Sequence, residues 1–187
     1  MSDQTAQQDS LIDELPGELM MWVLIISELL VFGAGLLVFL AVRLTDPEGF
    51  AEAQSHLYRT GAALNTVVLI TSGFLAAQAL AWRRASERLK ARLALIAAAA
   101  LGVVFLVIKG AEYAGKAAQG ITYETHPFFM FYYLLTGFHA AHVVAGVIIL
   151  LLVAWRDSPR KFETGAQFWH MVDLVWVLLF PVVYLLG

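Results

Sequence analysis

The sequence predicts an all-α fold, an integral membrane bundle of five transmembrane helices. Composition is the first observation: 60% of the 187 residues are hydrophobic and 14% are charged, which gives more apolar surface than a soluble domain of this length can bury. The second is that five apolar segments have about the 20 residues that a spanning helix needs. These segments are continuous, without two-residue alternation, which indicates helices rather than the strands of a membrane barrel.

The expected spans cover, in order, about residues 19–42, 62–82, 93–113, 128–155 and 168–186. Short polar links join them, so residues 19–187 are expected to form one membrane domain. Residues 1–18 are acidic and contain no Lys or Arg. A signal peptide begins with a basic region, so this segment is expected to be an exposed cytoplasmic tail.

Basic residues gather in the second and fourth links. Eight Lys and Arg lie in or beside these links, against three in the first and third links. The eight are Arg83, Arg84, Arg88, Lys90, Arg92, Arg156, Arg160 and Lys161. Because cytoplasmic loops carry the excess of Lys and Arg, the N-terminus is expected in the cytoplasm and the C-terminus in the periplasm.

Ionisable residues inside the expected spans are candidates for function, because a charge in the bilayer is costly. Glu28 lies in the first span, and three pairs on later spans each share a helix face, since their members are three residues apart. The pairs are Lys109 with Glu112, His139 with His142, and His170 with Asp173. Helix direction places Glu28, His142 and Asp173 at similar depths. We therefore expect one buried polar cluster of Glu28, His139, His142, His170 and Asp173, and a structural Lys109–Glu112 pair nearer the outer surface.

The two histidines of "TGFHAAHVVAG" admit three interpretations. A metal site would require His139, His142, His170 and Glu28 to converge, and the spacing alone is weak support for it. Hydrogen bonds from the rings to carboxylates and carbonyls of other helices are the preferred interpretation. Proton handling is the third, because histidine titrates near neutral pH. No metal-binding, cofactor-binding or catalytic residue is predicted.

Composition also bears on function. The chain has no cysteine, which excludes disulfides, thiolate-bound clusters and covalently attached c-type haem. A net charge of −3 gives no indication of a nucleic-acid partner. A small proton or ion transporter is an alternative of another class, although the internal repeat common in transporters is missing from the sequence. No nucleophile and base are placed as an enzyme would require.

Five motifs occur in order along the spans: "WVLIISELLVFGAG", "LNTVVLITSG", "KGAEYAG", "TGFHAAHVVAG" and "FETGAQFWHMVDLVW". Together they resemble the subunit III family of haem–copper oxidases, the cytochrome c oxidase subunit III family, in its five-helix form. The matching positions outside the ionisable set are Ser27, Asn65, Tyr113, Glu163, Trp169 and Trp176.

The resemblance implies a non-catalytic accessory subunit in a bacterial inner (cytoplasmic) membrane. Its partner would be a catalytic subunit of the haem–copper superfamily that holds the haem and metal. Phospholipids would lie in a cleft between helices, and Glu28 would correspond to a buried carboxylate near the partner's proton-uptake side. The five histidines are too few for the haems and metal of the catalytic subunit.

Within the family, the motifs look closer to the branch that accompanies nitric oxide reductase, often called NorE. We therefore expect support of nitric oxide reductase assembly or activation in denitrification. A resident subunit III of a terminal cytochrome c or quinol oxidase in aerobic respiration is the alternative. Trp169 and Trp176 are expected to take part in the association if the fifth helix faces the partner.

Overall fold

The protein is an all-helical bundle in its computed structural model, which describes residues 19–156 and 159–186. Five helices are long and apolar enough to cross a membrane, and the described residues contain no strand. They are α2 (Leu19–Arg43), α4 (Arg59–Arg84), α5 (Arg88–Ala118), α6 (Pro127–Arg156) and α7 (Pro159–Phe180). The predicted fold class is confirmed. The tail expected at residues 1–18 lies outside the described residues.

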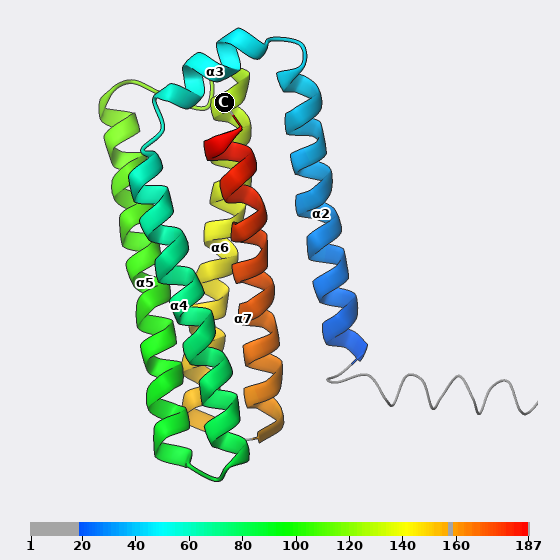
Figure 1. Cartoon of the computed structure of the whole chain (residues 1–187), viewed down its shortest axis with the longest axis vertical. Coiled ribbons are helices and arrows are strands. Elements are labelled where there is room, and N and C mark those ends of the chain that lie inside the picture. Colours follow the sequence, from blue (N-terminus) through cyan, green and yellow to red (C-terminus); the bar gives the residue numbers. More distant parts are fainter. Residues whose placement is uncertain (1–18, 157–158, 187) are drawn as a thin grey trace, which may run out of the picture.

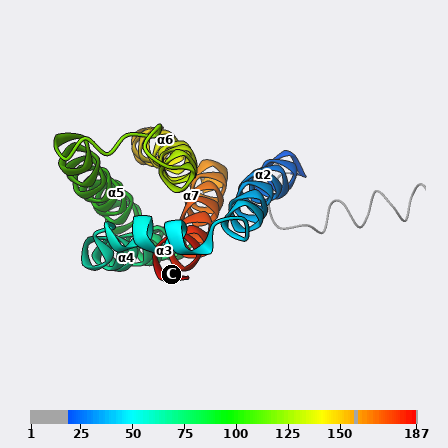
Figure 2. The same ribbon diagram turned by 90° about the horizontal axis from the view of Figure 1, so that it is seen from above.

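Four helices, α4 to α7, form the body of the bundle, and α2 packs against α6 and α7 at its side (Figures 1 and 2). α5 lies on the opposite side of the bundle from α2 (Figure 2). The turn between α4 and α5 lies at one end of the bundle and α3 (Pro47–Ser55) at the other (Figure 1). We call these the basic end and the α3 end.

The helix α3 is absent from the sequence-based prediction, although its start carries a recognisable signal. Asp46 is the N-cap and accepts a hydrogen bond from the Gly49 backbone N–H at 3.1 Å, while Pro47 occupies the first turn. A capping acid followed by proline favours a helix start. At its far end, Gln54 Nε2 donates to the carbonyl of Val183 at 2.8 Å, which fixes α3 across the bundle.

A second contact holds the segment between α2 and α3 in place. His126 Nε2 lies 3.1 Å from Asp46 Oδ2. That hydrogen bond, followed by the one from Gly49, lowers the pKa of the exposed Asp46 carboxyl.

The fifth span begins earlier than expected, because α7 starts at Pro159 and not near residue 168. The polar stretch "FETGAQ" is helical here, with Phe162 and Ala166 buried. At the other end, α7 changes to a π-helical turn, Pro181–Leu185. Proline has no N–H to give to the preceding turn, so the α-helical hydrogen bonding cannot continue unchanged.

The Trp169 ring packs in the core between α5 and α6. It lies against Gly146 of α6 and Gly102 of α5, where an added Cβ would come within 2.5 Å and 2.6 Å of ring atoms. The indole N–H donates to Ser72 Oγ of α4 at 3.0 Å. One side chain of α7 therefore fixes the spacing of three other helices, and two of them need glycine at the contact.

Candidate functional site

Glu28 and His142 meet where α2 packs on α6. His142 Nε2 lies 3.2 Å from Glu28 Oε2, an ion-pair distance without hydrogen-bond alignment. His142 Nδ1 lies 2.9 Å from the carbonyl oxygen of Phe138. Because a carbonyl oxygen only accepts, Nδ1 must carry a hydrogen.

The two side chains come from different helices and meet within a membrane-spanning region. Of the Glu28 side chain 24% is exposed, and of the His142 side chain 17%. The contact joins two of the five residues expected in the buried cluster.

His139 is fully buried and lies among aromatic rings. Its ring stacks on Trp176 at a centroid distance of 5.3 Å and meets the edge of Phe105 at 5.5 Å. Neither ring nitrogen has a hydrogen-bond partner among the described residues. The hydrogen-bonded role expected for His139 is therefore wrong, because aromatic faces surround the ring in place of carbonyls and carboxylates.

His170 and Asp173 lie on α7, with His170 Nδ1 4.0 Å from Asp173 Oδ2. Asp173 faces Gly73 of α4 so closely that a Cβ there would be 2.1 Å from its Oδ2. This carboxyl group is buried, whereas the His170 side chain is 47% exposed. Gly73 thus provides the space that Asp173 needs inside the bundle.

The five residues expected in one cluster therefore occupy three separate environments. His139 lies in the core against Trp176, whereas His142 lies where α6 meets α2, beside Glu28. The residues that the structure describes contain no group of three or more His, Cys, Asp or Glu able to hold a metal ion. The convergence of His139, His142, His170 and Glu28 considered for a metal site is not observed.

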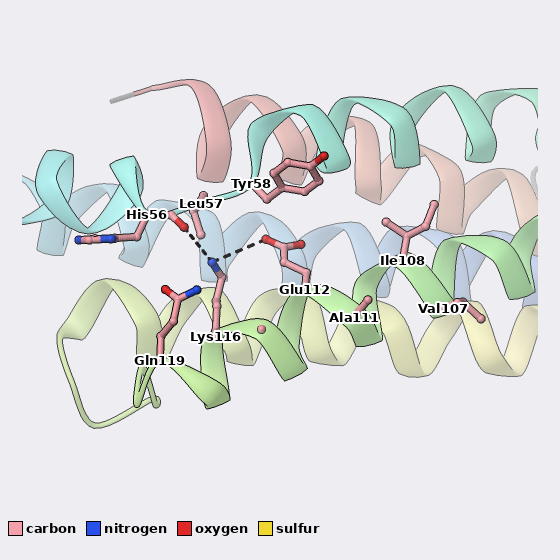
Figure 3. Close-up of a pocket in the computed structure, with 10 residues that line it drawn as sticks. His56, Leu57, Tyr58, Val107, Ile108, Ala111, Glu112, Lys116 and Gln119 are labelled. Carbon is pink, nitrogen blue, oxygen red and sulfur yellow. Dashed lines mark hydrogen bonds and ion pairs between the residues drawn. The ribbon is translucent and has the colours of Figure 1, made fainter.

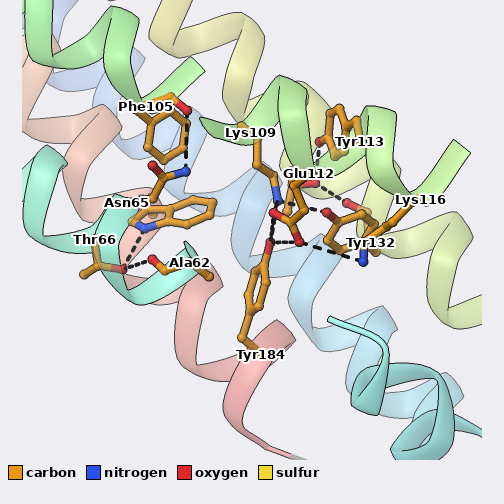
Figure 4. Close-up of polar contacts among 12 residues, drawn as sticks. Ala62, Asn65, Thr66, Phe105, Lys109, Glu112, Tyr113, Lys116, Tyr132 and Tyr184 are labelled. Atoms are coloured by element: carbon orange, nitrogen blue, oxygen red, sulfur yellow. Dashed lines mark hydrogen bonds and ion pairs between the residues drawn. The ribbon is translucent and has the colours of Figure 1, made fainter. Parts of the chain in front are cut away.

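Lys109 and Glu112 form the expected ion pair, with Nζ 2.9 Å from Oε2. Both side chains are buried near the α3 end, and two tyrosines complete the contact (Figure 4). Lys109 Nζ donates to the hydroxyl of Tyr132 at 3.0 Å and to that of Tyr184. The three donors of this ammonium group are thus all used.

Tyr132, Tyr184 and Lys116 also belong to this network, and they are not among the residues that the sequence predicts for it. Lys116 lies one helical turn after Glu112, with Nζ 3.9 Å from Glu112 Oε1. The i, i+4 spacing of a glutamate and a lysine was a usable signal. Nothing in the sequence marks the tyrosines, because they come from α6 and the π-helical turn.

The remaining family-motif residues join helices or form a hydrogen bond within their own helix. Asn65 Nδ2 donates to the Phe105 carbonyl at 3.4 Å, and Tyr113 lies 2.6 Å from Thr136 Oγ1. Glu163 forms an exposed ion pair with Arg84 at 3.5 Å. Ser27 donates to the Leu24 carbonyl of its own helix at 2.8 Å.

Trp169 and Trp176 are completely buried, and the Trp176 indole donates to Thr66 Oγ1 of α4 at 3.0 Å. The conditional prediction that truncating either ring loosens association stays a prediction, and such an effect would have to act through the packing of α7. Both rings hold the bundle together, and a partner has no access to them.

These helices and their buried pairs define a multi-pass membrane protein organised around helix packing. The family model for cytochrome c oxidase subunit III matches residues 17–187. The chain belongs to the cytochrome c oxidase subunit III family.

Relatives described as cytochrome c oxidase subunit 3 are similar over most of the chain. The protein of Synechocystis sp. is 34% identical over 149 residues, which cover 75% of this chain and 61% of the relative. That of Corynebacterium diphtheriae is 30% identical and covers 87% and 84%, and that of Thermostichus vulcanus is 32% identical and covers 88% and 84%. The chain therefore spans less than two thirds of the Synechocystis protein.

Proposed function

We propose that the chain is an accessory subunit III of an oxygen-reducing haem–copper oxidase in a bacterial cytoplasmic membrane. The family match over residues 17–187 carries this proposal, and the relatives above are described as cytochrome c oxidase subunit 3. The haem and metal belong to the catalytic partner. The nitric oxide reductase branch expected from the motifs has no support in these comparisons.

The orientation proposed for the chain places the basic end in the cytoplasm. Arg83, Arg84 and Arg88 surround the turn at this end, in agreement with the bias of cytoplasmic loops toward Lys and Arg. The start of α2 lies toward the same end, short of the turn between α4 and α5 (Figure 1). His142 is midway along α6, 15 residues from its start at Pro127 and 14 from its end at Arg156. The depth proposed for the Glu28–His142 pair is therefore near the middle of the membrane.

The role proposed for the Glu28–His142 pair is to keep a proton available beside the partner. The support is the 3.2 Å contact between a carboxyl group and an imidazole inside a membrane span, since ionisable groups at such a depth commonly belong to proton relays. Phospholipids held between helices, implied by the family resemblance, are part of the proposal.

The first test compares membranes with and without this chain. Oxygen uptake is expected to decline faster during sustained turnover when the chain is missing, while nitric oxide uptake is unchanged. A loss confined to nitric oxide uptake would contradict the oxidase assignment and favour the reductase branch.

The second test addresses the pair. Glu28→Gln is expected to assemble normally, because glutamine has the same shape, and to shorten the period of full oxidase activity. Glu52→Gln is the control, since Glu52 is exposed on α3 at the other end of the bundle. Identical time courses for the two variants would remove the proton-supply role.

A further inference from the structure

Charge is unbalanced at the α3 end of α5. Lys109, Glu112 and Lys116 are all buried there, with side-chain exposures of 1%, 6% and 5%. Two ammonium groups face one carboxylate, so the ionised set carries one surplus positive charge. A buried surplus charge is costly unless a counter-charge approaches it.

Lys116 is the member with free donor capacity. Its Nζ makes one hydrogen bond in the described part of the chain, to the His56 carbonyl at 3.2 Å, and lies 3.9 Å from Glu112 Oε1. An ammonium group has three donors. Lys109, by contrast, uses all of its donors and lies over the rings of four aromatic residues, whereas Lys116 lies over one, the ring of Tyr132 at 5.4 Å.

Lys116 and Glu112 line a pocket of about 610 Å³ between α5 and the segment joining α3 to α4 (Figure 3). The wall descending along α5 is apolar and consists of Val107, Ile108 and Ala111. Val107 is 65% exposed, so the wall continues onto the outer surface of the helix. From Lys116 to Val107 the helix extends about 14 Å, with a cation at the membrane edge and an apolar surface toward the membrane interior.

We propose that this pocket binds an acidic phospholipid, whose phosphate meets Lys116 and whose acyl chain lies along Val107, Ile108 and Ala111. An acidic phospholipid with an uncharged alcohol on its phosphate has a net charge of about −1, which matches the single surplus positive charge. A small multivalent anion fits less well, because Glu112 would repel it and the apolar wall offers it no hydrogen bonds. The pocket is on the α5 side of the bundle, away from α2, and the proposal holds whichever catalytic subunit the chain joins.

The test is native mass spectrometry of the full chain in detergent, titrated with dioleoylphosphatidylglycerol or dioleoylphosphatidylcholine. The acidic lipid is expected to bind at about tenfold lower concentration. Phosphatidylcholine brings a choline cation with its phosphate and therefore leaves the surplus positive charge uncompensated. Lys116→Gln is expected to abolish that preference. Lys90→Gln is the matched control, because Lys90 is exposed at the basic end, and it should bind as the unmodified chain does.

Gly115→Leu tests the pocket without removing a charge. Gly115 lines the pocket, and a Cβ at this position meets no atom within 4 Å, so the leucine fills the space and also suits a helix. It is expected to lose lipid binding while remaining folded, which keeps the test decisive if Lys116→Gln does not fold. Equal binding of the two lipids, or unchanged binding in Gly115→Leu, would overturn the proposal. Displacement of the acidic lipid by millimolar inorganic phosphate would also overturn it, in favour of a site for free anions.

Discussion

Replacing Gly146 by alanine is predicted to destabilise the bundle, although alanine is the better helix former. The new Cβ would lie 2.5 Å from Trp169 Cε3, and ordinary contact begins at 3.4 Å. The ring cannot retreat freely, because Gly102 lies against it on α5 and its N–H is bonded to Ser72.

The magnitude follows from these distances. The ring or α6 must shift by about 0.9 Å, the difference between 3.4 Å and 2.5 Å. Overpacking a core costs about 1–3 kcal/mol, and a ring held by several helices belongs in the upper part of that range. The higher helix propensity of alanine offsets about 1 kcal/mol of this cost. The net loss is therefore about 1–2 kcal/mol.

The assay is unfolding of the purified chain in mixed detergent micelles, followed by circular dichroism as the denaturing detergent is increased. Gly110→Ala is the matched control, since its Cβ meets no atom within 4 Å, and it is expected to gain up to about 1 kcal/mol. Equal stabilities of Gly146→Ala and Gly110→Ala would refute the reasoning that Trp169 determines the helix spacing.

Three further predictions concern polar groups. His139→Leu is expected to preserve or raise the free energy of unfolding, by up to about 1–3 kcal/mol, because it removes buried nitrogens that lack partners; a clear loss of stability would contradict this. Glu112→Gln is expected to lower the free energy of unfolding by about 3–5 kcal/mol, because it leaves two buried lysines without a counter-charge. Glu163→Gln, the control in the exposed pair, should lower it by less than about 1 kcal/mol. Equal losses in the two variants would contradict this prediction. The Asp46 carboxyl has a pKa below its ordinary value in the folded chain. Its contribution to the free energy of unfolding is therefore present above the unfolded pKa and is lost as pH falls through the folded pKa. When stability is measured against pH, Asp46→Asn should lack this loss in acid, and an unchanged pH dependence would exclude this role of Asp46.

The helices were largely predictable because their apolar runs record the length of a membrane span. The start of α7 was not, since "FETGAQ" is too polar to be assigned to a span by hydrophobicity and becomes helical by burying Phe162 in the bundle. α3 was missed although Asp46 and Pro47 mark its start, because its nine residues are short compared with the spans.

The candidate site was predictable only within single helices. The Lys109–Glu112 pair follows from spacing on α5, whereas Tyr184 reaches Lys109 through the folding of distant segments. Spacing also grouped His139 with His142, but the turn of α6 directs one ring into aromatic packing and the other toward Glu28. Local periodicity gives the face of a residue only approximately and does not identify what lies opposite.

The most direct measurement is the optical and metal spectrum of whatever co-purifies with this chain in mild detergent. The proposed function predicts a stoichiometric partner with haem and copper that consumes oxygen. A b-type haem protein that consumes nitric oxide, or a colourless chain without a partner, would contradict it.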